Sequence, residues 1–172
     1  DNAIVKIGFP MGPLALMDHV GLDVCADVIS EDRILAMDEK TRLEVSFTAK
    51  KMHDEGGLLG KKGGKGFYLY DHKTGKKSSV NSSVDSLIER GNQNKIPLKI
   101  IQNRLLLSLL NEAALTLSEG IISNPKDGDI GAIFGMGFPP FEGGPFRMLD
   151  KNLELILTQM EELVDQYGER FK

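Results

Sequence analysis

The sequence predicts an all-α fold, and three observations support this prediction. Apolar residues recur every three to four positions over long stretches, prolines stand directly before helix-favouring runs, and only one short segment has the composition of a strand. The chain has 172 residues, of which 41% are hydrophobic and 27% are charged. This composition is ordinary for a folded domain, and the length allows one substantial core or two smaller cores packed together.

In the first half, a short helix is expected at residues 14–20, directly after Pro13. Two longer helices are expected at residues 22–40 and 41–55. Their apolar faces contain Ile34, Leu35, Leu43, Val45 and Phe47.

The amino-acid composition changes twice in the residues that follow. Residues 56–66 are rich in glycine and lysine and cannot hold a helix, whereas the aromatic run at 66–70 favours an extended segment. Residues 71–94 are mostly polar and predict a connector. It is expected to contain one helix, whose apolar stripe is Val84, Leu87 and Ile88.

The second half contains the clearest helical pattern, at residues 98–121. Its apolar side chains recur every four residues, at Ile101, Leu105, Leu109, Ala113, Leu117 and Ile121. Leu106, Leu110 and Ala114 widen this stripe, so the helix is expected to be buried on most sides. Further helices are expected at residues 129–136 and, as one or two helices, between Pro145 and Tyr167.

A motif of glycine, phenylalanine and proline occurs twice in matching surroundings. Gly8-Phe9-Pro10, Gly12-Pro13 and Asp18 recur as Gly137-Phe138-Pro139, Gly144-Pro145 and Asp150. The preceding residues Ala3, Ile4, Val5 and Ile7 align with Ala132, Ile133, Phe134 and Met136. The long helix at 98–121 precedes the second copy, and its counterpart would fall before residue 1. We therefore interpret the chain as two unequal copies of one helical unit, the first without its opening helix.

Composition argues against several functions. The net charge of −4 gives no general attraction to nucleic acid, and no apolar stretch reaches the roughly 20 residues of a membrane span. The single cysteine, Cys25, cannot form an internal disulfide, which suits a reducing compartment, and its apolar neighbours predict a buried, unreactive thiol. The histidines His19, His53 and His72 are far apart in the sequence, so no metal site is expected.

Nucleotide-binding motifs are also missing from the sequence. Neither Gly-x-Gly-x-x-Gly nor a phosphate-binding Gly-x-x-x-x-Gly-Lys-Ser/Thr occurs. Because the glycines of the dinucleotide motif have geometric roles that other residues cannot easily take, the chain alone is not expected to bind NAD.

Several of these motifs resemble a known family. The run from Gly8 to Leu14, followed by Asp18, Val20-Gly21-Leu22-Asp23 and the lysine–glycine stretch 62–70, resembles the C-terminal domain of 3-hydroxyacyl-CoA dehydrogenases. The second half resembles the second C-terminal repeat of the multifunctional α subunit of the fatty acid β-oxidation complex. That resemblance rests on Asn111-Glu112-Ala113-Ala114, Glu119-Gly120, residues 127–132, 137–141 and 143–146, and Tyr167-Gly168-Glu169-Arg170-Phe171.

The resemblance implies a specific fold and domain organisation. The expected fold is two tandem copies of the dehydrogenase C-terminal helical domain, which is similar to the C-terminal domain of 6-phosphogluconate dehydrogenase. The first repeat, lacking its first helix, is expected at residues 1–78, a connector at 79–96, and the second repeat at 97–172.

The resemblance also implies an activity for the parent enzyme, the NAD-dependent oxidation of 3-hydroxyacyl-CoA to 3-ketoacyl-CoA beside an enoyl-CoA hydratase/isomerase region. NAD and the catalytic histidine–glutamate pair would belong to a Rossmann domain absent from this chain. In the family, an asparagine in the first helix of the first repeat lies near the substrate and assists the reaction. Asn103 lies in a similar motif but in the second copy, so this role is not transferred to it. The chain is therefore expected to contain no catalytic residue and to be inactive alone.

Two groups of residues are candidates for substrate contact. Lys61, Lys62 and Lys65, in a cluster continued by Lys73, Lys76 and Lys77, would attract the phosphates of CoA; the alternative is a solvated loop. Met11, Pro13 and Leu14 would face the acyl chain; the alternative is a helix–helix turn with Phe9 as a core residue. Asp18 is expected to cap or orient a helix rather than to react.

Two functions remain open at this point. The first is that the chain helps to form the acyl-CoA cleft and packs against the parent's Rossmann domain. The second is a non-catalytic assembly module that self-associates or docks to the thiolase β subunit through an apolar groove. The resemblance implies a cytoplasmic location in bacteria, or the mitochondrial matrix in a eukaryote.

Overall fold

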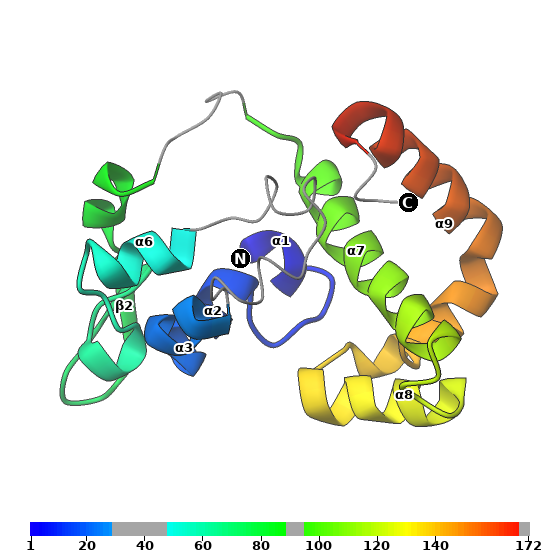
Figure 1. The fold of residues 1–172 in the computed structure, drawn as a ribbon, viewed down its shortest axis with the longest axis horizontal. Helices are drawn as coiled ribbons and strands as arrows, with labels where there is room; N and C mark the ends of the chain where they lie inside the picture. Colours follow the sequence, from blue (N-terminus) through cyan, green and yellow to red (C-terminus); the bar gives the residue numbers. More distant parts are fainter. Residues whose placement is uncertain (29–47, 89–94, 169–172) are drawn as a thin grey trace. The chain divides into compact units, whose positions relative to one another are not determined.

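The computed structural model describes residues 1–28, 48–88 and 95–168, and these residues are mainly helical, as predicted (Figure 1). The contacts divide the chain into two compact units. Unit 1 combines Asp1–Gly12 with Lys95–Lys172, and unit 2 is Pro13–Asn94. In the described part of the chain, no helix is both long enough and apolar enough to span a membrane.

Unit 1 is built from helices throughout its described residues. They are α1 (Asn2–Val5), α7 (Leu98–Ser118), α8 (Pro125–Gly131), the π-helical turn η3 (Ala132–Met136), the 3-10 turn η4 (Pro140–Glu142) and α9 (Pro145–Tyr167). Figure 1 shows α7 and α9 as its two long elements. The π-helical turn and a non-helical Asn152 inside α9 interrupt an otherwise regular set of helices.

Side-chain caps set the beginnings of two helices in unit 1. The Asn124 side chain accepts a hydrogen bond of 3.0 Å from the backbone N–H of Asp127 and begins α8. The carboxylate of Asp129 accepts a bond of 2.8 Å from the backbone N–H of Phe146, in the first turn of α9. A carboxylate is stabilised at this end of a helix because the unpaired N–H groups and the helix dipole attract negative charge.

The core of unit 1 joins the first residues of the chain to its second half. Ile4 and Phe9 lie in one buried cluster with Leu107, Leu110 and Phe138. The side-chain amide of Gln102 on α7 donates a hydrogen bond of 3.0 Å to the carbonyl of Ala3. The first twelve residues are therefore part of the same core as α7 and α9.

The two Gly-Phe-Pro turns contact each other in a reciprocal way. The rings of Phe9 and Phe138 meet edge to face, with 5.5 Å between their centroids. A Cβ on Gly137 would collide with Pro10, whereas a Cβ on Gly8 would collide with the ring of Phe141, 2.6 Å away, and would lie 3.1 Å from Pro139. The two turns are therefore closely packed in the core of unit 1.

The prediction that the long helix is buried on most sides was wrong. Within the described residues of α7, only Leu107 and Leu110 are fully buried, and Leu115 is 43% exposed. The helix also ends at Ser118, three residues before the predicted limit of 121. Its wide apolar stripe lines two surface grooves, one toward α9 and one toward α8, so part of the stripe remains accessible.

Unit 2 has three helices and a small antiparallel sheet in its described part. The helices are α2 (Pro13–Val20), α3 (Leu22–Val28) and α6 (Thr48–Asp54), and the strands are β1 (Tyr68–Tyr70) and β2 (Lys77–Val80). Two 3-10 turns, η1 (Lys61–Gly63) and η2 (Ser82–Ser86), complete it. Its core contains Leu22, Ala49, Met52, Leu58, Phe67 and Val84.

Several predicted elements of unit 2 are confirmed and one is corrected. The helix at 14–20 and the extended segment at 66–70 correspond to α2 and β1. The connector at 71–94 contains the unexpected strand β2, and Val84 lies in a 3-10 turn instead of an α-helix. The parts of the predicted helices at 29–47, including all five of their named apolar residues, lie outside the described residues.

The predicted repeat boundaries, at 1–78, 79–96 and 97–172, concern the ancestry of the sequence and stay a prediction. The compact units divide the chain differently because residues 1–12 pack with the second half.

We predict that Phe138→Ala lowers the free energy of unfolding by about 3–5 kcal/mol, because Phe138 is fully buried and its loss leaves a cavity in unit 1. The matched control is Phe134→Ala, since Phe134 is 86% exposed and its truncation should change stability by less than about 0.5 kcal/mol. Urea unfolding followed by circular dichroism measures both; equal effects would contradict the assignment of Phe138 to the core.

Candidate functional site

The candidate site is the lysine–glycine loop of unit 2, and its position depends on Asp18. This aspartate lies on α2 and is completely buried. Its carboxylate accepts hydrogen bonds from the backbone N–H groups of Phe67 and Tyr68, at 2.9 and 3.0 Å, and from the hydroxyl of Tyr70, at 3.0 Å. These three donors end the loop and begin β1, so Asp18 fixes the loop against α2.

Asp18 was expected to cap or orient a helix, and it does not cap one. It occupies the interior of α2 and its carboxylate binds the loop instead of a helix N-terminus. The buried carboxylate has its hydrogen bonds satisfied by donors about 50 residues away in the sequence.

Two glycines are required where the loop passes Asp18. A Cβ on Gly66 would collide with the Asp18 carboxylate, and a Cβ on Gly60, whose φ is 77°, would collide with the Asp18 backbone. The loop is also held from the other side, because the Asn81 side chain donates a hydrogen bond of 2.8 Å to the carbonyl of Gly66. Residues 60–70 are thus held against α2 and Asn81 by hydrogen bonds and close backbone contacts.

The first loop lysine, Lys61, contacts a histidine on α2. The Nδ1 of His19 lies 2.8 Å from the carbonyl oxygen of Ala15, which can only accept, so Nδ1 carries the proton of the neutral ring. Nε2 is then free to accept a hydrogen bond from the Lys61 ammonium, 3.2 Å away. His19 also packs edge to face against Tyr70, with ring centroids 6.1 Å apart.

The second loop lysine, Lys62, forms an ion pair with Asp23 at the beginning of α3. The hydrogen bond from Lys62 holds the pKa of the Asp23 carboxyl below its usual range. This pair and the contact between Lys61 and His19 tie both ammonium groups to the α2–α3 region.

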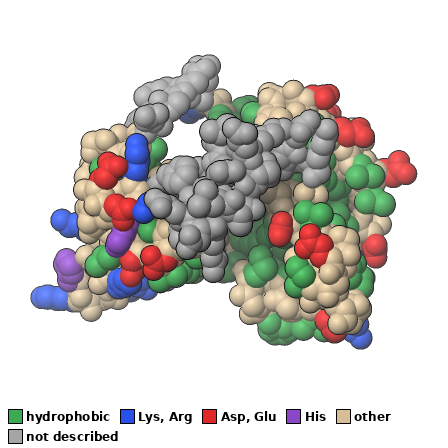
Figure 2. All heavy atoms as spheres, viewed as in Figure 1, with side chains coloured by type: hydrophobic (Ala, Val, Ile, Leu, Met, Phe, Trp, Pro, Cys, Tyr) green, Lys and Arg blue, Asp and Glu red, His purple; other side chains and the backbone are tan. Residues whose placement is uncertain are grey.

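The remaining cations of the cluster are more accessible. Lys65, Lys73 and Lys76 are exposed, and the Lys77 ammonium lies 4.1 Å from the centroid of the Tyr68 ring. Figure 2 shows basic and histidine side chains gathered at the tip of unit 2, on the lower left. This tip is a cationic surface supported by a rigid glycine-containing loop.

The three residues predicted to face an acyl chain belong to different units: Met11 is in unit 1, and Pro13 and Leu14 are in unit 2. Met11 is half-buried in the turn before α2, Pro13 begins α2, and Leu14 is 38% exposed. Leu14 lines a cavity of about 620 Å³ within unit 2, together with Met17, Phe67, Tyr68 and Val84. Phe9 is a core residue, as the structural alternative for this turn requires.

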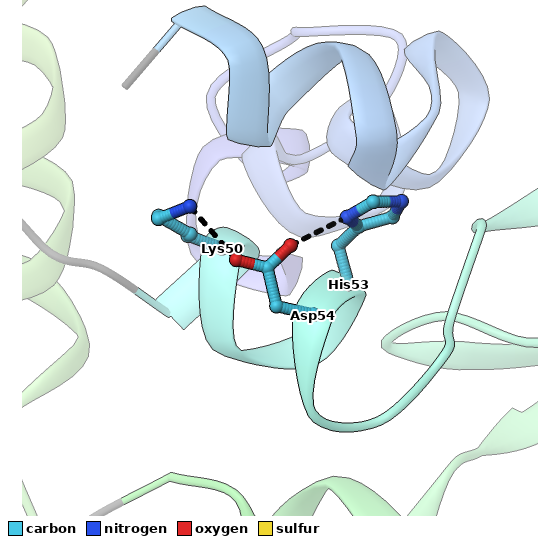
Figure 3. Close-up of polar contacts among 3 residues, drawn as sticks. All are labelled: Lys50, His53 and Asp54. Carbon is cyan, nitrogen blue, oxygen red and sulfur yellow. Dashed lines mark hydrogen bonds and ion pairs between the residues drawn. The ribbon is translucent and has the colours of Figure 1, made fainter. Parts of the chain in front are cut away.

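Outside the loop, the described residues include the thiol of Cys25 and an ionic cluster on α6. Burial, followed by the charges of Asp23 and Asp18, raises the pKa of the Cys25 thiol, the opposite of what a nucleophile needs. On α6, Asp54 contacts Lys50 and His53 at 2.8 Å each, an exposed cluster (Figure 3). Among residues 1–28, 48–88 and 95–168, no three histidine, cysteine or acidic side chains are grouped as metal ligands.

Comparison with known proteins confirms the resemblance predicted from the sequence. Residues 1–70 match the family model of the 3-hydroxyacyl-CoA dehydrogenase C-terminal domain. The fatty acid oxidation complex subunits α of Idiomarina loihiensis and Shewanella amazonensis are 46% and 44% identical to this chain over 99% of its length. The chain spans about a quarter, 24%, of the length of each of these relatives.

A solved structure agrees with these sequence relationships. The dehydrogenase part of multifunctional enzyme 1 from C. elegans matches with a TM-score of 0.64 and 29% sequence identity. The match covers 99% of this chain and 39% of that protein chain.

We predict that Asp18→Asn lowers the free energy of unfolding by about 2–4 kcal/mol, because the amide keeps one acceptor but turns its NH2 group toward donors of the loop. The matched control is Asp150→Asn, at the equivalent position of the second Gly-Phe-Pro copy, where the side chain is exposed. Its effect should stay below about 0.5 kcal/mol. Chemical unfolding followed by tyrosine fluorescence compares the two; a neutral Asp18→Asn would contradict the anchoring role.

A second prediction concerns the pH dependence of the ion pair. Because its pKa is lowered in the folded state, Asp23 stabilises the fold above its unfolded pKa of about 3.9 and loses this contribution as pH falls through the folded pKa. Lys62→Met should raise the pKa of Asp23 toward the ordinary value, as measured by NMR titration of the carboxyl carbon. An identical Asp23 titration in both proteins would show that the pair is not formed in solution.

Proposed function

From this kinship with fatty acid oxidation α subunits, we propose that the chain contributes to the acyl-CoA site of an NAD-dependent 3-hydroxyacyl-CoA dehydrogenase. In this proposal the loop lysines Lys61, Lys62 and Lys65 attract the phosphates of CoA, and the turn residues Met11, Pro13 and Leu14 face the acyl chain. The chain supplies no catalytic group and is inactive alone. In the whole protein, the chain would pack against the Rossmann domain. The protein would be located in the bacterial cytoplasm.

The observation that carries this proposal is the rigid presentation of the cationic loop. A solvated lysine loop needs no buried anchor, yet here Asp18, Asn81 and two closely approached glycines fix residues 60–70. Fixing the loop lowers the entropy lost when an anion binds, because the backbone is already ordered. Ammonium groups presented in this way suit a phosphate, which accepts charge-assisted hydrogen bonds.

The described residues do not fit NAD. The sequence has no Gly-x-Gly-x-x-Gly, and the described sheet is a pair of short antiparallel strands instead of a parallel sheet followed by helix N-termini. We therefore assign NAD to another part of the parent enzyme.

The assembly function is the second candidate, and exposed apolar side chains favour it. On unit 1, Phe134 and Phe141 are 86% and 72% exposed. Figure 2 shows hydrophobic side chains at the surface of this unit. Contact with a further protein surface, such as a thiolase β subunit or another copy of the chain, would remove them from water.

We predict that coenzyme A binds the purified chain weakly at low salt, and that replacing Lys61, Lys62 and Lys65 together by alanine weakens this binding by about tenfold, or 1.4 kcal/mol. Isothermal titration calorimetry at two salt concentrations measures the effect, which should shrink at high salt because ions screen exposed charges. Dephospho-CoA, with fewer negative charges, should bind less tightly.

The matched control replaces Lys126 and Lys151, exposed cations of unit 1, by alanine. This variant should keep the affinity of the unaltered chain. If the loop variant and the control bind coenzyme A equally well, the loop is not a phosphate site. Turnover of a 3-hydroxyacyl-CoA with NAD by the chain alone would contradict the assignment of catalysis to the rest of the parent.

A further inference from the structure

The cavity of unit 2 is a feature that the lysine loop does not explain. Its volume is about 620 Å³, which lies within the range of small-ligand sites in proteins. Its lining side chains come mainly from α2, α6, β1, β2 and η2, and all of them belong to unit 2. Because five elements surround it, the cavity suits a small molecule better than a helix, whose diameter is about 10 Å.

The walls of this cavity are mostly apolar. They include Leu14, Met17, Phe67, Tyr68, Val80 and Val84. The polar side chain of Asn81 also lines the cavity, but its amide group already donates a hydrogen bond of 2.8 Å to the carbonyl of Gly66. Its side-chain oxygen accepts a bond of 2.7 Å from the Ser83 hydroxyl. An apolar ligand therefore leaves these groups of Asn81 with their partners, and the cavity favours a hydrocarbon.

Two exposed apolar residues mark the opening of the cavity. Leu14 and Val80 both line it, and they are 38% and 72% exposed. Val80 is the partner of Tyr68 across the strand pair, so the two side chains lie on the same face of the sheet. A hydrocarbon chain that enters between these residues would remove their apolar surface from water, which is favourable.

The charges near the cavity favour a negatively charged head group. The Lys77 ammonium lies 4.1 Å from the centroid of the Tyr68 ring, which is part of the cavity wall. The hairpin of β1 and β2 contains three lysines, which outnumber the nearby acidic residues Asp71 and Asp85. An apolar cavity beside a net positive hairpin matches an amphipathic anion.

We propose that the cavity of unit 2 binds an unbranched alkyl chain attached to an anionic head group, with the head group near Lys77. An acyl-CoA and a free fatty acid both combine these two parts. The inference deepens the proposed function and rests on it for the choice between these two sources. Leu14, one of the turn residues assigned to the acyl chain, lines this cavity.

The test compares CoA, dodecanoyl-CoA and dodecanoate as ligands of the chain by isothermal titration calorimetry, at concentrations where the lipids are monomeric. We expect dodecanoyl-CoA to bind at least tenfold more tightly than CoA, because buried methylene groups leave water. Dodecanoate should bind with one molecule per chain.

Val80→Asp should abolish the gain of dodecanoyl-CoA over CoA, because it places a carboxylate at the opening of an apolar cavity. The matched control is Val20→Asp, since Val20 is 50% exposed on α2 and is not among the lining residues. The gain is a ratio within each variant, so the effect of the added charge on the CoA head group cancels. Leu14→Asn, on a helix instead of a strand, should reduce the gain at least threefold and serves as a second variant if Val80→Asp lowers the unfolding midpoint.

Equal affinities for CoA and dodecanoyl-CoA would overturn the proposal, and so would equal gains in Val80→Asp and Val20→Asp. Tighter binding of dodecanoyl-CoA than of dodecanoate would support the proposal with the thioester as the source, and the reverse order would support it with the free fatty acid. Failure of the loop proposal has a different signature. Replacing Lys61, Lys62 and Lys65 by alanine would then leave the affinity for CoA unchanged while the gain from the alkyl chain remains.

Discussion

The buried carboxylate of Asp18 is the constraint on which the candidate site depends. It brings the end of the lysine–glycine loop onto α2, and this close approach in turn requires glycine at positions 60 and 66. The loop then reaches back over α2 and α3, where Lys61 meets His19 and Lys62 meets Asp23. The position of the lysines thus depends first on the Asp18 anchor, to which Asn81 and the contacts of Lys61 and Lys62 add.

The second copy of the Gly-Phe-Pro motif keeps the turn but lacks this anchor. Asp150 occupies the position equivalent to Asp18, yet it is exposed on α9. The shared part of the repeat is therefore the packed turn, in which Phe9 and Phe138 meet. The copies therefore differ in the environment of this aspartate, which is buried under the loop in unit 2 and exposed in unit 1.

Local signals in the sequence predicted the helical class, α2, β1 and the long helices of the second half. They also identified the loop lysines and the repeated turn as features of interest. Sequence periodicity could not predict that Asp18 binds Phe67, Tyr68 and Tyr70, because a contact across about 50 residues leaves no local pattern. The same limit applies to α7, whose wide apolar stripe was interpreted as complete burial although part of it lines open grooves.

The discontinuity of unit 1 has a consequence for the order of folding during synthesis. Residues 1–12 are synthesised before unit 2, but their packing partners in α7 and α9 are made only after the whole of unit 2. Unit 2 is a continuous segment and can fold while the chain is still growing. The core contacts of Ile4 and Phe9 with α7 form only after that, so the growing chain carries an apolar segment that a chaperone could bind.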